Sequence, residues 1–243
     1  MTYDILRDSG ISDLKSYMDS LPEKQATTLA YWIHDYTRFL KQEASFDPKK
    51  LIRYKRGSVI KVHLGYKIGS EEGGLHYAVV INKTPALSDK VLTVIPLISI
   101  KPNTDLGKLH YSKINLGNEL HSMLNQKLTD HITKKRELQA KVLETMRSIG
   151  DSVQKGELQL IAAGVNQQLQ TLQSHIAQAQ KMQKEINRMR SGSIALVGQI
   201  TTVSKIRIYD PLYPADVLSN IRLSDKSMDQ LDAKLIELFT KNI

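Results

Sequence analysis

Two residues near the middle of the chain carry side chains that could take part in proton transfer. His76 follows the glycine-rich run Gly69 to Gly74, and Ser99 ends an apolar run. A histidine can act as a general acid or base near neutral pH, and its cationic form can stabilise negative charge. A serine hydroxyl can donate a hydrogen bond to a developing charge. Both side chains could therefore take part in acid–base chemistry.

These residues also have structural interpretations. His76 could be a half-exposed strand residue without chemistry, and Ser99 could cap the backbone at a strand end. In the glycine-rich run, Glu71 could hold the loop in shape, while Gly73 and Gly74 could supply a turn geometry that other residues cannot adopt. The sequence leaves these alternatives open.

Basic residues gather in one stretch. The chain has 243 residues, with 34 Lys and Arg against 25 Asp and Glu, a formal net charge of +9. This balance favours an acidic partner such as nucleic acid or an anionic membrane. Seven basic residues precede Glu71 in a stretch without acids: Lys49, Lys50, Arg53, Lys55, Arg56, Lys61 and Lys67. Arg56 could contact phosphate or pair with Glu71 or Glu72, and a basic face is expected here.

Several classes of chemistry are excluded. The chain has no cysteine, so disulfides, thiolate catalysis and zinc sites built on cysteine are ruled out. The histidines have no carboxylates at metal-ligand spacing, and no P-loop motif is present, so we expect no metal and no cofactor. Charged residues near the N-terminus and the lack of a long apolar stretch predict a cytoplasmic protein without a membrane span.

Helices and then strands are expected before residue 118. Apolar residues recur at spacings of three and four over 1 to 47, and Pro22 divides this segment into two helices. From residue 54 the pattern changes to short β-branched runs at 58 to 64, 77 to 81, 91 to 98 and 109 to 116, joined by turn-rich connections. This predicts an antiparallel sheet or small barrel that begins after residue 48.

A pair of long helices interrupts the strand pattern. Apolar residues follow helical steps over 120 to 149 and over 165 to 189, with Gly150 and Gly156 between them. This predicts an antiparallel hairpin, close to the seam of a coiled coil. Strand patterns return over 193 to 200 and 201 to 208, and a final helix follows. We expect an α+β chain in four segments: N-terminal helices (1–48), first part of a barrel (49–118), inserted hairpin (119–191), and second part of the barrel with a C-terminal helix (192–243).

Several blocks resemble the MazF/PemK family of toxins, in the family's order. Residues 55 to 60 read KRGSVI, residues 69 to 74 read GSEEGG, and residues 75 to 82 read LHYAVVIN. Residues 96 to 99 read PLIS where the family commonly has PLTS, and residues 193 to 207 are similar to its later strand and QIRTIDK-like sequel. The resemblance covers about 55 to 118 and 192 to 240.

The resemblance implies a small SH3-like barrel with a C-terminal helix. It further implies a homodimer that cleaves single-stranded RNA and is silenced by an antitoxin protein. Cleavage of this class uses the ribose 2'-hydroxyl and needs a base, an acid and positive donors around the phosphorane, without a metal. By this resemblance we assign the RNA contacts to eight residues: Arg56, Lys55, Lys61, Lys67, Ser70, Glu71, Gly73 and Gly74.

Two positions differ from the family pattern. The family's functional arginine and threonine correspond here to His76 and Ile98, with Ser99 beside the latter. By this resemblance we take His76 and Ser99 as the candidate catalytic residues. Histidine lacks arginine's bidentate fork, and Ser99 would act through a one-residue shift, which reverses the face of a strand. Two functions follow: an endoribonuclease toxin, or a module of the same fold that binds RNA or protein without cleaving. The hairpin and N-terminal helices could add oligomerisation or target binding to either.

Overall fold

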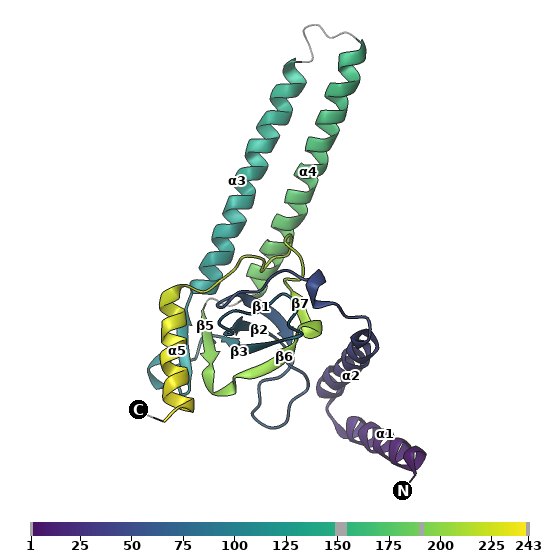
Figure 1. Ribbon diagram of the computed structural model, residues 1–243, viewed down its shortest axis with the longest axis vertical. Coiled ribbons are helices and arrows are strands. Elements are labelled where there is room, and N and C mark those ends of the chain that lie inside the picture. Colours follow the sequence, from purple (N-terminus) through teal and green to yellow (C-terminus); the bar gives the residue numbers. More distant parts are fainter. Residues whose placement is uncertain (1, 149–154, 190–191, 242–243) are drawn as a thin grey trace.

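The computed structural model describes residues 2–148, 155–189 and 192–241. Within these ranges the chain is α+β, with five α-helices and seven strands in one antiparallel sheet. Figure 1 shows the sheet at the centre, a long helical hairpin rising from it, and the two N-terminal helices at its other end.

The strands are short and rich in β-branched residues. They are β1 (Val59–His63), β2 (Leu75–Val80), β3 (Val91–Ser99), β4 (Lys113–Gly117), β5 (Ser193–Leu196), β6 (Thr201–Ser204) and β7 (Ile208–Asp210). Their order is β4-β5-β3-β2-β1-β7, with β6 also paired to β3, so the sheet is open with β4 and β7 at its ends. The expected strands at 58 to 64, 77 to 81 and 91 to 98 are confirmed. The fourth starts later than expected, at Lys113, because a turn in which the Lys113 N–H donates to the His110 carbonyl precedes it.

Strand β3 organises the sheet. Its first half pairs with β6, its middle with β2, and its end with β5. A 3-10 turn (Val197–Gln199) separates β5 from β6, and a second one (Lys205–Arg207) separates β6 from β7. Continuous strands over 193 to 200 and over 201 to 208 were therefore wrong predictions. Lys205 is buried in the second turn, where its ammonium donates to the carbonyls of Ala86 and Leu87.

Each face of the sheet has its own apolar core, since successive side chains of a strand point to opposite faces. One core joins Val59, Val79 and Leu97 to the base of the hairpin and to α5 (Asp225–Phe239). The other core contains Val62 and Ala78, together with Ile60, Val80, Leu92, Val94 and Val203. Both faces are thus covered along most of β1, β2 and β3.

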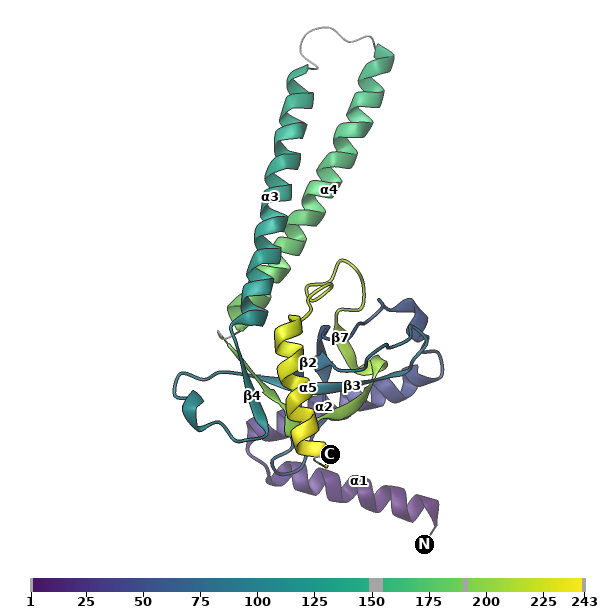
Figure 2. The same cartoon turned by 60° about the vertical axis from the view of Figure 1, so that its left-hand side comes forward.

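The hairpin consists of α3 (Glu119–Ser148) and α4 (Lys155–Arg188), which lie side by side in Figures 1 and 2. Its base buries Leu124 and Met182 in the first core. Lys61 and the Tyr77 hydroxyl both bond to the Glu185 carboxylate, which fixes α4 to the sheet. The expected turn at Gly150 lies outside the described residues, and Gly156 falls within α4.

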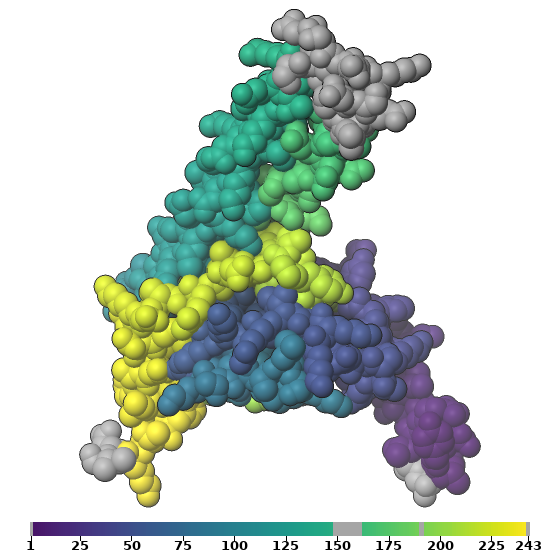
Figure 3. All heavy atoms as spheres, turned by 45° about the horizontal axis from the view of Figure 1, so that its top comes forward, coloured from purple at the N-terminus to yellow at the C-terminus, as the bar shows by residue number. Residues whose placement is uncertain are grey.

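The N-terminal helices are α1 (Tyr3–Ser20) and α2 (Glu23–Glu43), divided at Pro22 as predicted. Trp32 of α2 stacks on His63, with ring centroids 4.6 Å apart. Helix α1 buries none of its residues and protrudes from the body of the molecule (Figures 2 and 3). Among the described helices, none combines the length and apolar character needed to cross a membrane.

Candidate active site

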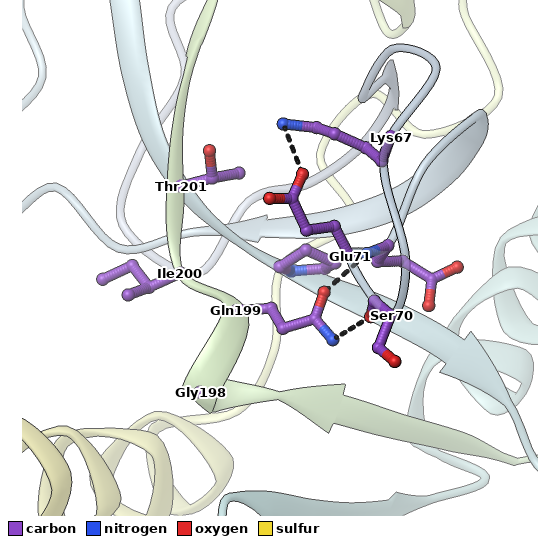
Figure 4. Close-up of a pocket in the computed structure, with 9 residues that line it drawn as sticks. Lys67, Ser70, Glu71, Gly198, Gln199, Ile200 and Thr201 are labelled. Carbon is purple, nitrogen blue, oxygen red and sulfur yellow. Dashed lines mark hydrogen bonds and ion pairs between the residues drawn. The ribbon is translucent and has the colours of Figure 1, made fainter.

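A polar pocket of about 490 Å³ lies between the glycine-rich loop after β1 and the segment that leads into β6 (Figure 4). The loop wall and the opposite wall come from parts of the chain more than 120 residues apart. The lining residues are Lys67, Ser70, Glu71, Glu72, Pro96, Gly198, Gln199, Ile200 and Thr201. Three of the predicted RNA-contact residues, Lys67, Ser70 and Glu71, therefore share one site.

Glycines close the loop that forms the first wall. The Leu64 N–H donates to the Gly74 carbonyl, and the Gly74 N–H donates to the Gly65 carbonyl, each at 2.7 Å. Gly74 has a φ of +82°, and a Cβ at Gly73 would lie 2.8 Å from the Gly65 carbonyl oxygen. Both positions therefore require glycine. The expected turn geometry is confirmed at Gly74, whereas Gly73 is required by the close approach of the Gly65 carbonyl.

Gln199 holds the two walls together. Its side-chain oxygen accepts the Glu72 N–H at 2.6 Å, and its side-chain nitrogen donates to the Ser70 carbonyl at 3.1 Å (Figure 4). One amide thus satisfies a donor and an acceptor of the loop backbone. Lys67 and Glu71 form an ion pair at 3.8 Å at the pocket's edge. The loop is held in one shape from across the pocket.

The Glu72 carboxylate links this pocket to His76. Glu72 Oε1 lies 2.9 Å from His76 Nε2, and both side chains are about a quarter exposed, at 25% and 27%. An ionised carboxylate at this distance attracts a protonated imidazole and can orient the ring. A histidine oriented by a carboxylate is a recurrent arrangement for general acid–base catalysis.

Sheet register places Ile98 next to His76. In the β2–β3 pair, Tyr77 lies opposite Leu97 and Ala78 lies opposite Pro96. Continuing this register by one residue places His76 opposite Ile98. Thus the two positions that depart from the family pattern are neighbours on one face. His76 also pairs with Val62 of β1.

Ser99 lies on the other face of the sheet. It is exposed and pairs with Ser193 of β5. Because adjacent residues of a strand point to opposite faces, Ser99 and His76 are not brought together. The structure thus separates the two candidate catalytic residues.

Two of the basic residues assigned to RNA contacts have partners within the chain. The Arg56 guanidinium bonds to the Ile81 carbonyl and to Asp232 of α5, and not to Glu71 or Glu72. Lys61 pairs with Glu185 on the hairpin side of the sheet. The Lys55 side chain is exposed, but it does not line the pocket. Lys67 is the one residue of this basic group among the lining residues.

His63 supports the start of the loop. Its Nδ1 accepts the Gly65 N–H at 3.0 Å, and Asp35 lies 3.9 Å from its Nε2. Burial lowers the pKa of His63; the charge of Asp35 opposes this, and the nearby charges of Arg207, Arg38 and His76 add to it. A neutral imidazole is consistent with accepting a backbone N–H.

Sequence reasoning did not assign Glu72, Gln199 or Thr201 to the site. Glu72 lies four residues before His76, which was the available signal for a pair between them. Gln199 is a polar residue at the end of an apolar run, a pattern that indicates a specific partner. Thr201 pairs with Val94 and lines the pocket, a placement that depends on sheet register.

Within the described ranges, no group of three or more His, Cys, Asp or Glu side chains could hold a metal ion. Comparison with known proteins found no family model that matches the chain and no curated protein that matches it. The resemblance to MazF/PemK toxins therefore rests on the blocks quoted above.

Proposed function

We propose that this protein is an endoribonuclease toxin of the MazF/PemK type that cleaves single-stranded RNA. The observation that carries the proposal is the contact of 2.9 Å between His76 and Glu72, which lines a polar pocket. His76 occupies the position of the family's functional arginine. An imidazole there can transfer protons, whereas arginine supplies only charge and donors.

In the proposed mechanism His76 removes the proton from a ribose 2'-hydroxyl. The 2'-oxygen attacks the adjacent phosphorus, and the bond to the 5'-oxygen breaks, which leaves a 2',3'-cyclic phosphate and a 5'-hydroxyl. The Glu72 carboxylate orients the ring and stabilises the imidazolium formed by the transfer. The proton on Nδ1 can then return to the departing 5'-oxygen.

Negative charge on the phosphorane requires donors. Lys67 and Thr201 line the pocket and can supply an ammonium and a hydroxyl. Lys67 is paired with Glu71 at 3.8 Å, a long contact that leaves ammonium protons available for a phosphate oxygen. Thr201 takes the role that was assigned to Ser99, because Ser99 lies on the opposite face.

The proposal also includes a more specific description of the fold. We take the seven-stranded sheet with α5 as the family's SH3-like barrel, and α3 and α4 as an inserted coiled-coil hairpin. The arrangement of β1, β2 and β3 around the loop and the placement of α5 against the same sheet support this. The expected homodimer and antitoxin partner follow from the family resemblance, whereas the expected cytoplasmic location follows from composition.

The test is cleavage of a mixed single-stranded RNA by the purified protein in excess chelator. We expect fragments with cyclic phosphate ends. His76→Gln should lower the rate by at least about 100-fold, since general acid–base catalysis contributes about 10² to 10⁴. Glu72→Gln should have a smaller effect of about tenfold, because a neutral partner still orients the ring without stabilising its charge.

His34 provides a matched control, since it is an exposed histidine on α2 away from the pocket. His34→Ala should cleave at the rate of the unmodified protein, and circular dichroism should show that all three variants are folded. Intact RNA after incubation with stoichiometric unmodified protein would refute the nuclease assignment.

A binding module without catalysis is the second candidate function. It is favoured by Ile98, which offers no hydroxyl opposite His76, and by the engagement of Arg56 and Lys61 within the chain. The double variant His76→Arg/Ile98→Thr restores the family pattern at both positions. If the protein is a binding module, the unmodified chain should bind RNA without cleaving it, and only the double variant should cleave. If it is a nuclease, the unmodified chain should already cleave.

A further inference from the structure

Helix α1 presents an apolar face that nothing in the described chain covers. Tyr3, Leu6 and Tyr17 are 74%, 63% and 53% exposed, and Leu14 is 39% exposed. Their spacing places them on one side of the helix, as in a surface helix that packs against a partner. Figure 2 shows α1 apart from the sheet and the hairpin. The exposed face therefore has no role in folding this chain.

The face is symmetric about its centre. Tyr3, Leu6, Gly10, Leu14 and Tyr17 are separated by three, four, four and three residues. Gly10 lies at the midpoint, inside a helix, where glycine is disfavoured. A Cβ at Gly10 would meet no atom within 4 Å, so packing within this chain does not require glycine. A small residue at the centre of an apolar face permits close approach of a second helix.

We propose that α1 pairs with α1 of a second copy of this chain, in an antiparallel two-fold arrangement that crosses at Gly10. A two-fold axis at Gly10 places Tyr3 against the partner's Tyr17 and Leu6 against the partner's Leu14. Such isologous contacts are characteristic of homodimers, because one surface patch serves both subunits. The pairing goes beyond the MazF/PemK resemblance, which does not cover residues 1 to 48.

The size and charge of this face fit a second copy. With these four side chains each helix could bury roughly 450 Å², or about 900 Å² in the pair, close to the roughly 1,000 Å² expected of a specific interface. Four aspartates against Arg7 and Lys15 make α1 acidic in a chain with a net charge of +9. RNA is therefore a poor occupant for this helix.

Cysteine cross-linking tests the crossing point, since the natural chain has no cysteine. Gly10→Cys should form a covalent dimer rapidly under mild oxidation, because both thiols would lie at the two-fold axis. Ser12→Cys places the same thiol on the opposite face and should cross-link at least tenfold more slowly. Equal rates for the two variants would overturn the proposed geometry.

Light scattering of the full chain tests the pairing itself. Leu6→Asp and Gly10→Leu should each raise the dissociation constant of the α1 contact at least tenfold. Gly10→Leu also favours the helix, so loss of pairing could not be attributed to an unfolded α1. Ile5→Asp introduces the same charge about 200° around the helix from Tyr3 and should leave the mass unchanged. The proposal would be refuted if none of these substitutions changed the molecular mass. It would also be refuted if α1 were found to pack against its own chain.

Discussion

The α3–α4 hairpin and helix α1 both lie outside the sheet and both carry apolar side chains, but these side chains are used differently. The base of the hairpin packs Leu124 and Met182 into the core on one face of the sheet, and Glu185 joins Lys61 and Tyr77 there. Helix α1 buries none of its residues. The same helical periodicity therefore produces a structural support in one region and a free surface in the other.

The difference follows from what each helix can reach. Residues 118 and 192, which flank the hairpin, lie next to β4 and β5, which are neighbours in the sheet. Both helices therefore start against the core. Helix α1 is connected only through α2, which is itself docked by Trp32 and by Asp35 on the Tyr209 hydroxyl. Changes at the hairpin base should thus affect folding, and changes in α1 should affect association.

The largest effect is expected at the hairpin base. Leu124 is fully buried, so Leu124→Ala should lower the free energy of unfolding by about 3 kcal/mol. Leu143→Ala on the same helix is the control, because Leu143 is 53% exposed and should change stability by less than about 0.5 kcal/mol. Urea unfolding followed by circular dichroism measures both. Similar losses for the two variants would contradict the distinction between base and exposed surface.

A smaller effect is expected at Lys127, which ties α3 to the loop before α5. Its ammonium donates to the carbonyls of Asp216, Val217 and Ser219 at 2.8 to 3.1 Å. Lys127→Met keeps the aliphatic stem but leaves these acceptors unpaired, so we expect a loss of about 2 kcal/mol. The exposed Lys134 supplies the control, and Lys134→Met should be nearly neutral in the same urea experiment.

We expect the stability of the protein to depend on pH through Asp210, the last residue of β7, whose carboxylate accepts the Leu218 N–H of the same loop. Burial raises the pKa of the Asp210 carboxyl to about 6. The charges of Asp216 and Glu185 raise this pKa further, whereas the hydrogen bond donated by the Leu218 N–H lowers it. Because the folded pKa exceeds the unfolded one, folding favours the protonated form. This contribution is lost as pH rises through about 6.

We therefore expect Asp210 to make the protein about 1 kcal/mol more stable at pH 5 than at pH 7.5. Asp210→Asn retains an oxygen acceptor for Leu218 and removes the charge, so it should reduce this difference. Unfolding free energies of both proteins at the two pH values provide the measurement. An unchanged difference in the variant would assign the pH dependence to other groups.

The smallest effect on folding is expected from deletion of residues 2 to 20. Since α1 has no buried residue, the free energy of unfolding, extrapolated to zero protein concentration, should change by less than about 0.5 kcal/mol. Trp32, the single tryptophan, reports on unfolding by fluorescence. A loss of several kcal/mol would show that α1 supports the fold, and would remove the contrast with the hairpin.

Local features of the fold were predictable from sequence. Pro22 divides the N-terminal helices, and β-branched runs mark β1 and β3, because these signals act within a few residues. The bend at Lys205 was not predictable, since it depends on the Ala86 and Leu87 carbonyls more than 110 residues away. His76 and Lys67 were candidate site residues from the sequence, but their partners Glu72 and Glu71 were identified only in the structure.

The sequence by itself determined the helices and most of the strands, and it offered a turn role for Gly73 and Gly74 as one interpretation. Only the tertiary structure decided which polar groups meet. It paired Arg56 with Asp232 and His76 with Glu72, and it placed Ser99 on the face opposite His76. The physical reason is that secondary structure follows from short-range periodicity, whereas a long side chain finds its partner through strand register and packing of distant segments.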